Sequence, residues 1–427
     1  MRAMPITLIL CFALAGTAGA TASAGENPPQ PVRLPAATDV STSPAATAAP
    51  TLHAVYRAAL ALDPFSGIAG AYRLEAQALE ARADGLFAAA PTLSLRQQSD
   101  RTGTDRGLRE WEANVEMALW RPGERSASRD EATSMDLLAT AREQALQLEV
   151  AGRVRDVLWE LALSEEQRSL AQQSWRDAQA LEKDVQRRVE AGDLAKADLL
   201  LAQDETLSKH DEYLLAADAV RAAEKRYVSI CGLPERPRGF SETQSPRGGI
   251  DPDHPLLLVA QRRVESARAE LRRLRAAGSD SPLLTVGSRR EREPVTRIEH
   301  DSLGVTLRVP FGGARYAGPA IAAANSQLVE AQAEQSALWR RLQMELHDAR
   351  RSLSTLQMEL ELAGQQDTMA RESLRMARIA FDTGEIDLVQ RLRVQARAYA
   401  TERNLNLRRL QLQQATARYN QTVGELP

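Results

Sequence analysis

The sequence predicts a mainly α-helical protein with a small β part, in which one structural unit occurs twice. Three observations lead to this fold class. Two helical stretches, 126–189 and 318–381, are each 64 residues long and lack internal turn signals. A pair of short segments with alternating apolar and polar residues precedes each stretch. The glycines that end the stretches, Gly192 and Gly384, lie 192 residues apart.

Composition argues against several classes of function. Among 427 residues, 54 Lys and Arg face 57 Asp and Glu, and no basic patch is studded with aromatic residues, so we expect no nucleic-acid partner. Five histidines and two cysteines are few and scattered, so we expect no metal site. The sequence has no Ser/His/Asp set, Cys/His pair or phosphate-binding loop. It therefore predicts neither enzymatic activity nor a cofactor.

The N-terminus predicts export. Residues 1–24 combine Arg2, a short apolar core over 6–15 and small residues that suit cleavage, which is typical of a signal peptide. A membrane anchor is the alternative, but the apolar core is too short to span a bilayer. Residues 25–51 are rich in Pro, Ala and Thr and predict a flexible leader.

The first structural repeat is expected over 52–234. Helical spacing over 52–88 is interrupted before Pro64, which suits the start of a new helix. Alternation then begins after Pro91. In the stretch 110–120, apolar residues such as Trp111 alternate with polar ones. A hairpin over a hydrophobic core is the common source of this pattern. The length, however, also matches the roughly 9–11 residues of a membrane β-strand.

The helical part of this repeat follows directly. The stretch 126–189 contains a single glycine, Gly152, and a narrow apolar seam. A helix of this length needs neighbours along its whole extent. We expect the chain to reverse at Gly192 and to return over 194–227. Cys231 and Gly232 then end the helix.

A linker over 235–252 leads to the second structural repeat, 253–427. The order of signals is the same as before: a helix, two strands separated by a charged turn over 289–300, a long helix and a returning helix over 386–419. Pro319 is expected at a tolerated position near the start of the long helix.

Four strands with one apolar and one polar face cannot close around a water-filled lumen, and their edges would be exposed to lipid. Other copies of the chain must therefore complete them, and three copies would supply twelve strands. The half-length helices 52–88 and 194–227 can stack end to end beside one full-length rod. The complete fold class is a long α-helical barrel of coiled-coil-like hairpins. It carries four transmembrane β-strands per chain, which form a 12-stranded barrel in a trimer.

From residue 52 onward, the chain resembles the TolC-like outer membrane efflux proteins of Gram-negative bacteria. The resemblance is carried by the repeat, by the strand end LGVTLRVPFGG over 303–313, and by the two glycine turns with their flanking apolar residues. The segment WRPGER over 120–125 is similar to the branch of the family that exports heavy-metal cations.

The resemblance implies a homotrimeric exit duct of a tripartite efflux or secretion system, which passes through the periplasm and the outer membrane and contacts outer membrane lipid. The implied partners are a periplasmic adaptor (membrane fusion) protein and an inner-membrane pump of the RND or ABC type. The exported substrate would be a metal cation or a drug. The competing hypothesis is a periplasmic coiled-coil scaffold or adaptor without a channel, but such a protein has no reason to carry two-faced strands.

The resemblance also implies that the glycine turns form a periplasmic gate. The family often places an acid six residues after the tip glycine. Asp198 stands there in the first repeat, whereas Gln390 stands there in the second. The gate is then less acidic than usual or is closed by mixed-charge contacts. The alternative is that these charges only solvate a helix face. The predicted gate residues are Gly192, Asp193, Asp198, Gly384, Asp387, Gln390, Arg391 and Arg393.

The polar strand faces predict the lining of the lumen, with Glu110, Glu112, Glu116 and Arg308 as candidate residues. Repeated in three copies, the glutamates would form a negative ring that attracts cations. The simpler interpretation is that polar residues only keep the channel wet.

Overall fold

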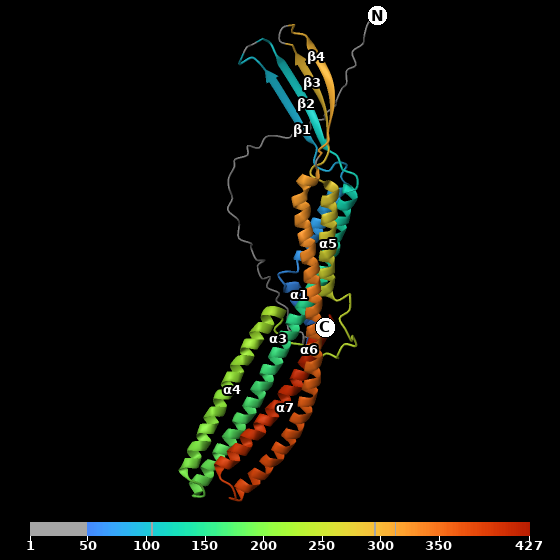
Figure 1. Ribbon diagram of the computed structural model, residues 1–427. Helices are drawn as coiled ribbons and strands as arrows, with labels where there is room; N and C mark the ends of the chain where they lie inside the picture. Colours follow the sequence, from blue (N-terminus) through green and yellow to red (C-terminus); the bar gives the residue numbers. More distant parts are fainter. Residues whose placement is uncertain (1–48, 104–105, 294–295, 312) are drawn as a thin grey trace. The chain divides into compact units, whose positions relative to one another are not determined.

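Two long helices dominate the architecture, and a shorter helix runs back beside each of them (Figure 1). The computed structural model describes residues 49–103, 106–293, 296–311 and 313–427. The predicted signal peptide and nearly all of the predicted leader lie outside these residues. Within the described ranges, no helix is both long enough and apolar enough to cross a membrane.

The same series of elements occurs twice. The first series is α1 (Leu52–Leu62), α2 (Ile68–Asp84), β1 (Thr92–Ser99), β2 (Arg109–Ala118), α3 (Glu124–Ala191) and α4 (Lys196–Cys231). The second series is α5 (Pro255–Ala277), β3 (Leu283–Arg292), β4 (Glu299–Arg308), α6 (Gly313–Asp382) and α7 (Leu388–Thr422). The predicted mainly helical fold with a small β part is confirmed.

The shorter helices share the length of the long ones. Helices α3 and α6 contain 68 and 70 residues, so each extends for about 100 Å at 1.5 Å per residue. Helices α2 and α4 both pack against α3, whereas α5 and α7 both pack against α6. The ends of α1 and α4 meet, because a side chain at Gly232 would collide with Leu62. The end-to-end arrangement predicted from the sequence is therefore present.

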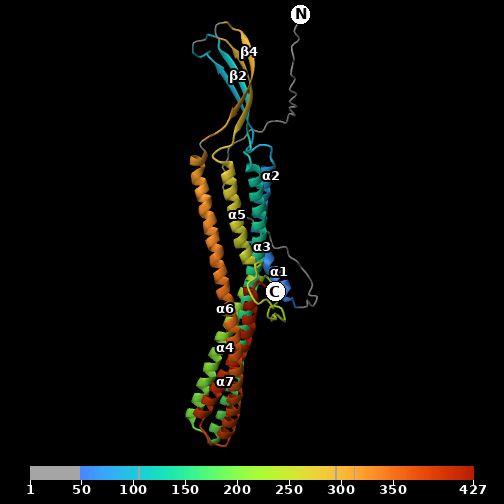
Figure 2. The same ribbon diagram turned by 45° about the vertical axis from the view of Figure 1, so that its right-hand side comes forward.

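Contacts between the two series define a fixed order of helices. Helix α3 packs against α5 over one part of its length and against α7 over another. At the glycine turns, the order across the molecule is therefore α4, α3, α7, α6 (Figure 1). At the end next to the strands the order is α2, α3, α5, α6 (Figure 2). Helix α6 lies at an edge in both regions.

The four strands form one antiparallel sheet in the order β1-β2-β3-β4. The pairing of β2 with β3 joins the hairpins of the two series, and Glu116 lies directly between Thr92 and Thr285. Because direct cross-strand partners share a face, this register places the polar residues of all four strands on one side. The apolar residues lie on the other side.

Two strands extend farther than the sequence indicated. The prediction of a charged turn over 289–300 was wrong, because β3 continues to Arg292 and β4 begins at Glu299. Charged residues sustain the ladder here through cross-strand pairing, as in the ion pair between Arg290 and Asp301 at 2.7 Å. Charge therefore did not mark a loop.

Two helix starts also differ from the prediction. Helix α2 begins at Ile68 rather than at Pro64, because the preceding residues form a turn in which the Phe65 amide donates to the Asp63 carboxylate at 2.8 Å. Helix α6 begins at Gly313, so Pro319 lies inside it. A proline lacks one N–H donor, and the bonds on either side of it hold this long helix together.

The buried side chains form separate clusters along the rods. One cluster joins α1, α3 and α4, another joins α5, α6 and α7, and a third lies at the glycine turns. Each fully buried Leu, Val or Phe contributes about 1.5–3 kcal/mol to folding, so every level of the rod has its own source of stability. Central members are Val154, Leu158 and Tyr227 in the first cluster, and Leu342, Leu346 and Tyr419 in the second.

Candidate functional site

The two glycine turns have the same backbone geometry. Gly192 and Gly384 adopt φ values of +87° and +78°, which favour glycine because a Cβ atom is strained there. Each turn closes with a hydrogen bond back to the last helical turn. The Asp193 amide donates to the Arg188 carbonyl and the Glu385 amide donates to the Ala380 carbonyl, both at 2.8 Å. We call these turns and the residues packed around them the tip.

The helices that leave the two turns are capped by different residues. The Asp198 carboxylate accepts a hydrogen bond from the Ala195 amide at 3.1 Å. In the second turn, the Asp387 carboxylate accepts one from the Gln390 amide at 2.7 Å. Each carboxylate satisfies a backbone donor at a helix start. The acid missing at position 390 therefore has a counterpart three residues earlier.

A shared apolar core joins the two turns. Phe381 and Leu388 from the second series pack together with residues of α3 and α4, so neither turn is free of the other. Burial of these side chains holds the four helix ends at one level. The buried members are Leu181, Val185, Ala202, Phe381 and Leu388.

Charged side chains surround this core. Arg188 binds the Asp382 carboxylate at 2.9 Å and also pairs with Asp184 at 3.3 Å. The guanidinium groups of Arg188 and Arg391 lie 4.9 and 4.7 Å from the centre of the Phe381 ring. A cation above an aromatic ring is attracted by its π electrons. Burial lowers the pKa of Arg391, while Asp382 and Asp184 oppose that shift.

The structure places the predicted gate residues in distinct settings. Asp193, Gln390 and Arg393 are exposed. Asp387 caps α7, and Arg391 lies on Phe381. The proposed mixed-charge contact among Asp387, Arg391 and Arg393 stays a prediction, and the ion pair that joins the two turns is Arg188 with Asp382.

The predicted lumen residues share the polar face of the sheet. Each of the three glutamates has an arginine partner on a neighbouring or nearby strand, so the face carries paired charges of both signs within one chain. This pairing favours a wet polar surface over a purely negative one. The pairs are Glu110–Arg289 at 2.7 Å, Glu112–Arg96 at 3.9 Å and Glu116–Arg308 at 3.7 Å.

The opposite face of the sheet is apolar and uncovered by the described part of the chain. Large apolar side chains occur on all four strands, and most of them are more than half exposed. A contiguous exposed apolar surface of this size indicates contact with lipid or with another protein. Its members include Leu93, Leu95, Trp111, Val115, Leu303, Val305 and Leu307.

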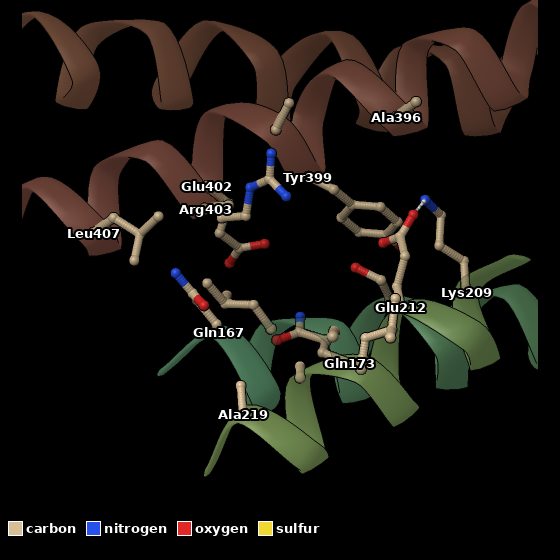
Figure 3. Close-up of a pocket in the computed structure, with 16 residues that line it drawn as sticks. Gln167, Gln173, Lys209, Glu212, Ala219, Ala396, Tyr399, Glu402, Arg403 and Leu407 are labelled. Atoms are coloured by element: carbon tan, nitrogen blue, oxygen red, sulfur yellow. Dashed lines mark hydrogen bonds and ion pairs between the residues drawn. The ribbon is translucent and has the colours of Figure 1, made fainter. Parts of the chain in front are cut away.

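A groove lies between α3, α4 and α7 (Figure 3). It encloses about 670 Å³ and is lined by Lys209, Glu212, Glu402 and Arg403 together with apolar residues. Tyr399 donates a hydrogen bond to Asp177 at 2.7 Å, and burial is the main reason that the pKa of Tyr399 is raised. The lining is mixed in charge and open, which suits contact with a polar surface rather than catalysis.

A buried polar cluster joins the linker between the repeats to α3 and α7. Arg155 binds both carboxylate oxygens of Glu242, at 2.6 and 2.7 Å. Asn420 bonds to the same carboxylate at 3.1 Å, and Gln421 donates to the Leu148 carbonyl at 2.8 Å. We call Arg155, Glu242, Asn420 and Gln421 the junction.

Sequence reasoning missed Arg155, Glu242, Arg188 and Asp382. The junction joins positions 87 to 266 residues apart, and no local pattern indicates such pairing. Gly152 gave one usable signal, since a side chain there would approach the Gln421 amide within 3.0 Å. Over the described residues, no cluster of three or more His, Cys, Asp or Glu residues could hold a metal ion.

Known proteins share this fold without close sequence similarity. Neither a family model nor a curated protein sequence matches the chain. The outer membrane protein VceC from Vibrio cholerae matches 88% of this chain and 97% of its own length, with a TM-score of 0.69 and 18% identity. CusC, described in terms of transmembrane channel formation, matches 88% of this chain and 92% of its own, with a TM-score of 0.72 and 15% identity.

The open state of the MtrE outer membrane channel from Neisseria gonorrhoeae matches 88% of this chain and 89% of its own, with a TM-score of 0.69 and 14% identity. These alignments leave out little of the described chain. The chain has the fold of the TolC-like outer membrane channels, as the sequence resemblance predicted.

Proposed function

We propose that this protein is the outer membrane exit duct of a tripartite efflux or secretion system in a Gram-negative bacterium. It acts as a homotrimer and opens at its periplasmic tip. The observation that carries the proposal is the sheet. An apolar face, a polar face and two open edges occur together at one end of helical rods about 100 Å long. The similarity in fold to outer membrane channels supports the same function.

The sheet also supports the number of copies. Strands β1 and β4 are the open edges, and an edge inside a membrane must be paired. Because the strands alternate in direction, β4 of one copy beside β1 of the next would also be antiparallel. Three copies then give a closed barrel of twelve strands, with the apolar face toward lipid and the paired charges toward the lumen.

The tip supplies the gate. A periplasmic adaptor and an inner-membrane pump of the RND or ABC type act at this end, and the exported molecule is a metal cation or a drug. Residues 52–234 and 253–427 are the duplicated units, with 235–252 between them. Gln390→Ala and Arg393→Ala are expected to raise the conductance of single channels, and unchanged conductance in both variants removes these residues from the gate.

A periplasmic scaffold or adaptor without a channel is the competing function. Membrane fractionation separates the two hypotheses, because a duct stays with the outer membrane after a high-salt wash and a scaffold remains in the soluble periplasmic fraction. The purified protein should then give trimers in detergent and discrete conductance steps in planar bilayers. A soluble protein without conductance would contradict the proposal.

A further inference from the structure

The glycine-turn half of the molecule has two open edges. The helices there follow the order α4, α3, α7, α6 (Figure 1). Helix α3 has a neighbour on each side, and so does α7. Helices α4 and α6 have a packed neighbour on one side only. The far side of each edge helix is therefore where another molecule would have to pack.

Both edge helices carry a stripe of exposed apolar residues at a spacing of seven. The α4 stripe consists of Leu200, Leu207 and Leu214, and the α6 stripe consists of Leu362, Met369 and Met376. All six side chains are between 51% and 68% exposed. A repeat of seven places residues along one side of a helix and is the spacing with which long helices pack against each other. Two such stripes on the two outermost helices call for partners.

The stripes lie at the same levels. Leu200, Leu207 and Leu214 follow Gly192 by 8, 15 and 22 residues, and Met376, Met369 and Leu362 precede Gly384 by the same numbers. The two glycine turns are level with each other, because a shared core and the Arg188–Asp382 pair hold them together. With the same rise per residue in both helices, each leucine of α4 has an apolar residue of α6 at its own height.

The polar residues between the stripes also match. Asp204 and Asp211 are exposed between the leucines of α4, at 12 and 19 residues from Gly192. Ser373 and Gln366 are exposed on the stripe side of α6, at 11 and 18 residues from Gly384. A hydroxyl and an amide can both donate to a carboxylate. No like charges would meet at these two levels.

We propose that the α4 stripe of one copy packs antiparallel against the α6 stripe of the next copy, with Leu200 beside Met376, Leu207 beside Met369 and Leu214 beside Leu362. This inference rests on the proposed trimeric duct. The contact joins two different surfaces, so it closes a ring only when the last copy meets the first. The heptad stripes thus set the vertical register between neighbouring copies.

Cysteine cross-linking in the full-length protein tests this register. The double variant Leu207→Cys/Met369→Cys, purified in detergent and oxidised with copper phenanthroline, should form covalent dimers and trimers on non-reducing gels. Leu200→Cys/Met376→Cys should do the same. A disulfide needs Cβ atoms roughly 3.5–4.5 Å apart, so only residues at matched levels can join. Each single variant should stay monomeric on the gel, because one copy then lacks the second thiol of the seam.

The mismatched variant Leu214→Cys/Met376→Cys is the control. Its two positions lie 14 residues apart in level, or about 21 Å, so it should give no cross-linked species. Cross-linking of this pair, or of Leu207→Cys alone, would overturn the proposed register. Absence of cross-links in both matched variants that still form conducting trimers would overturn the seam and leave the duct standing. A protein without trimers or conductance would instead overturn the proposed function, and the seam with it.

Discussion

The junction and the tip both use an arginine of α3 to hold the second repeat, but the two arginines differ in burial. The Arg155 side chain is 4% exposed and its partner Glu242 is 11% exposed. Arg188 and Asp382 are 27% and 58% exposed. Loss of one partner from a buried pair costs about 3–5 kcal/mol, whereas an exposed pair contributes about 0–1 kcal/mol.

This difference separates a fixed joint from an end that can open. At the junction, the carboxylate of Glu242 accepts from both Arg155 and Asn420, so no partial rearrangement satisfies the buried charges. At the tip, water can replace the Arg188–Asp382 pair at little cost. An adaptor or pump that acts at this end would thus have little electrostatic free energy to overcome. The measurements below test this comparison, beginning with the largest expected effect.

Removal of the junction arginine should have the largest effect. Arg155→Ala leaves Glu242 buried without its cationic partner, so we expect the free energy of unfolding to fall by about 3–5 kcal/mol. Thermal and denaturant unfolding of the purified protein, followed by circular dichroism, measures this loss. Arg226→Ala is the matched control, because Arg226 joins α4 to Glu160 of α3 through a largely exposed pair. A loss below about 1 kcal/mol is expected there, and equal losses in both variants would contradict the assigned difference.

The second effect concerns the backbone at the tip. Gly384 has a φ of +78° and open space around its Cα, so Gly384→Ala should cost about 1–2 kcal/mol through backbone strain alone. Gly364 lies inside α6 with equally open surroundings, and Gly364→Ala should stabilise the protein by about 0.5–1 kcal/mol. Opposite signs in denaturant unfolding would support this explanation. A stabilising effect at both positions would contradict the left-handed turn.

The sequence predicted the features that depend on local patterns. Gly192 and Gly384 revealed the repeat because only a few residue types suit a left-handed turn. Alternation in β2 predicted its two faces, since the side chains of a strand point to opposite sides in turn. Pro319 was misplaced because a proline does not by itself show where a long helix begins.

The tip and junction contacts could not be found in the same way. Arg188 and Asp382 lie 194 residues apart, and nothing in either neighbourhood distinguishes them from other charged residues on long helices. Gln390 was interpreted as a missing acid, but the structure supplies the reason for its presence. Asp387 already caps the helix there, as Asp198 does in the first turn. The roles of these residues in gating stay predictions.

The third effect is small in stability and visible in function. Asp382→Asn and Arg188→Gln each remove one charge of the pair that joins the two turns. We expect a change below about 1 kcal/mol in the free energy of unfolding, together with an increase in the open probability of single channels in planar bilayers. Raised ionic strength should reduce the difference from the unmodified protein, because salt screens exposed charges. Unchanged gating in both variants would show that the pair does not hold the tip closed.

The last prediction compares chemical access near the junction and at the tip, with no change in stability required. Cys231 is fully buried in the cluster formed by α1, α3 and α4, and burial raises its pKa to about 12. An exposed thiol ionises near pH 8.5, and the thiolate is the reactive form. At pH 8.5 we therefore expect Cys231 to resist iodoacetamide in the folded protein and to react after unfolding, as measured by mass spectrometry.

Asp193→Cys supplies the comparison, because position 193 is exposed at the tip and its thiol should be alkylated rapidly under the same conditions. Because the fold disfavours the Cys231 thiolate, stability should be lost as pH rises from about 8.5 toward 12 and should be unaffected below that window. Rapid alkylation of Cys231 in the folded protein would mean that this core opens readily. The contrast between a fixed joint and a releasable tip would then fail at its fixed end.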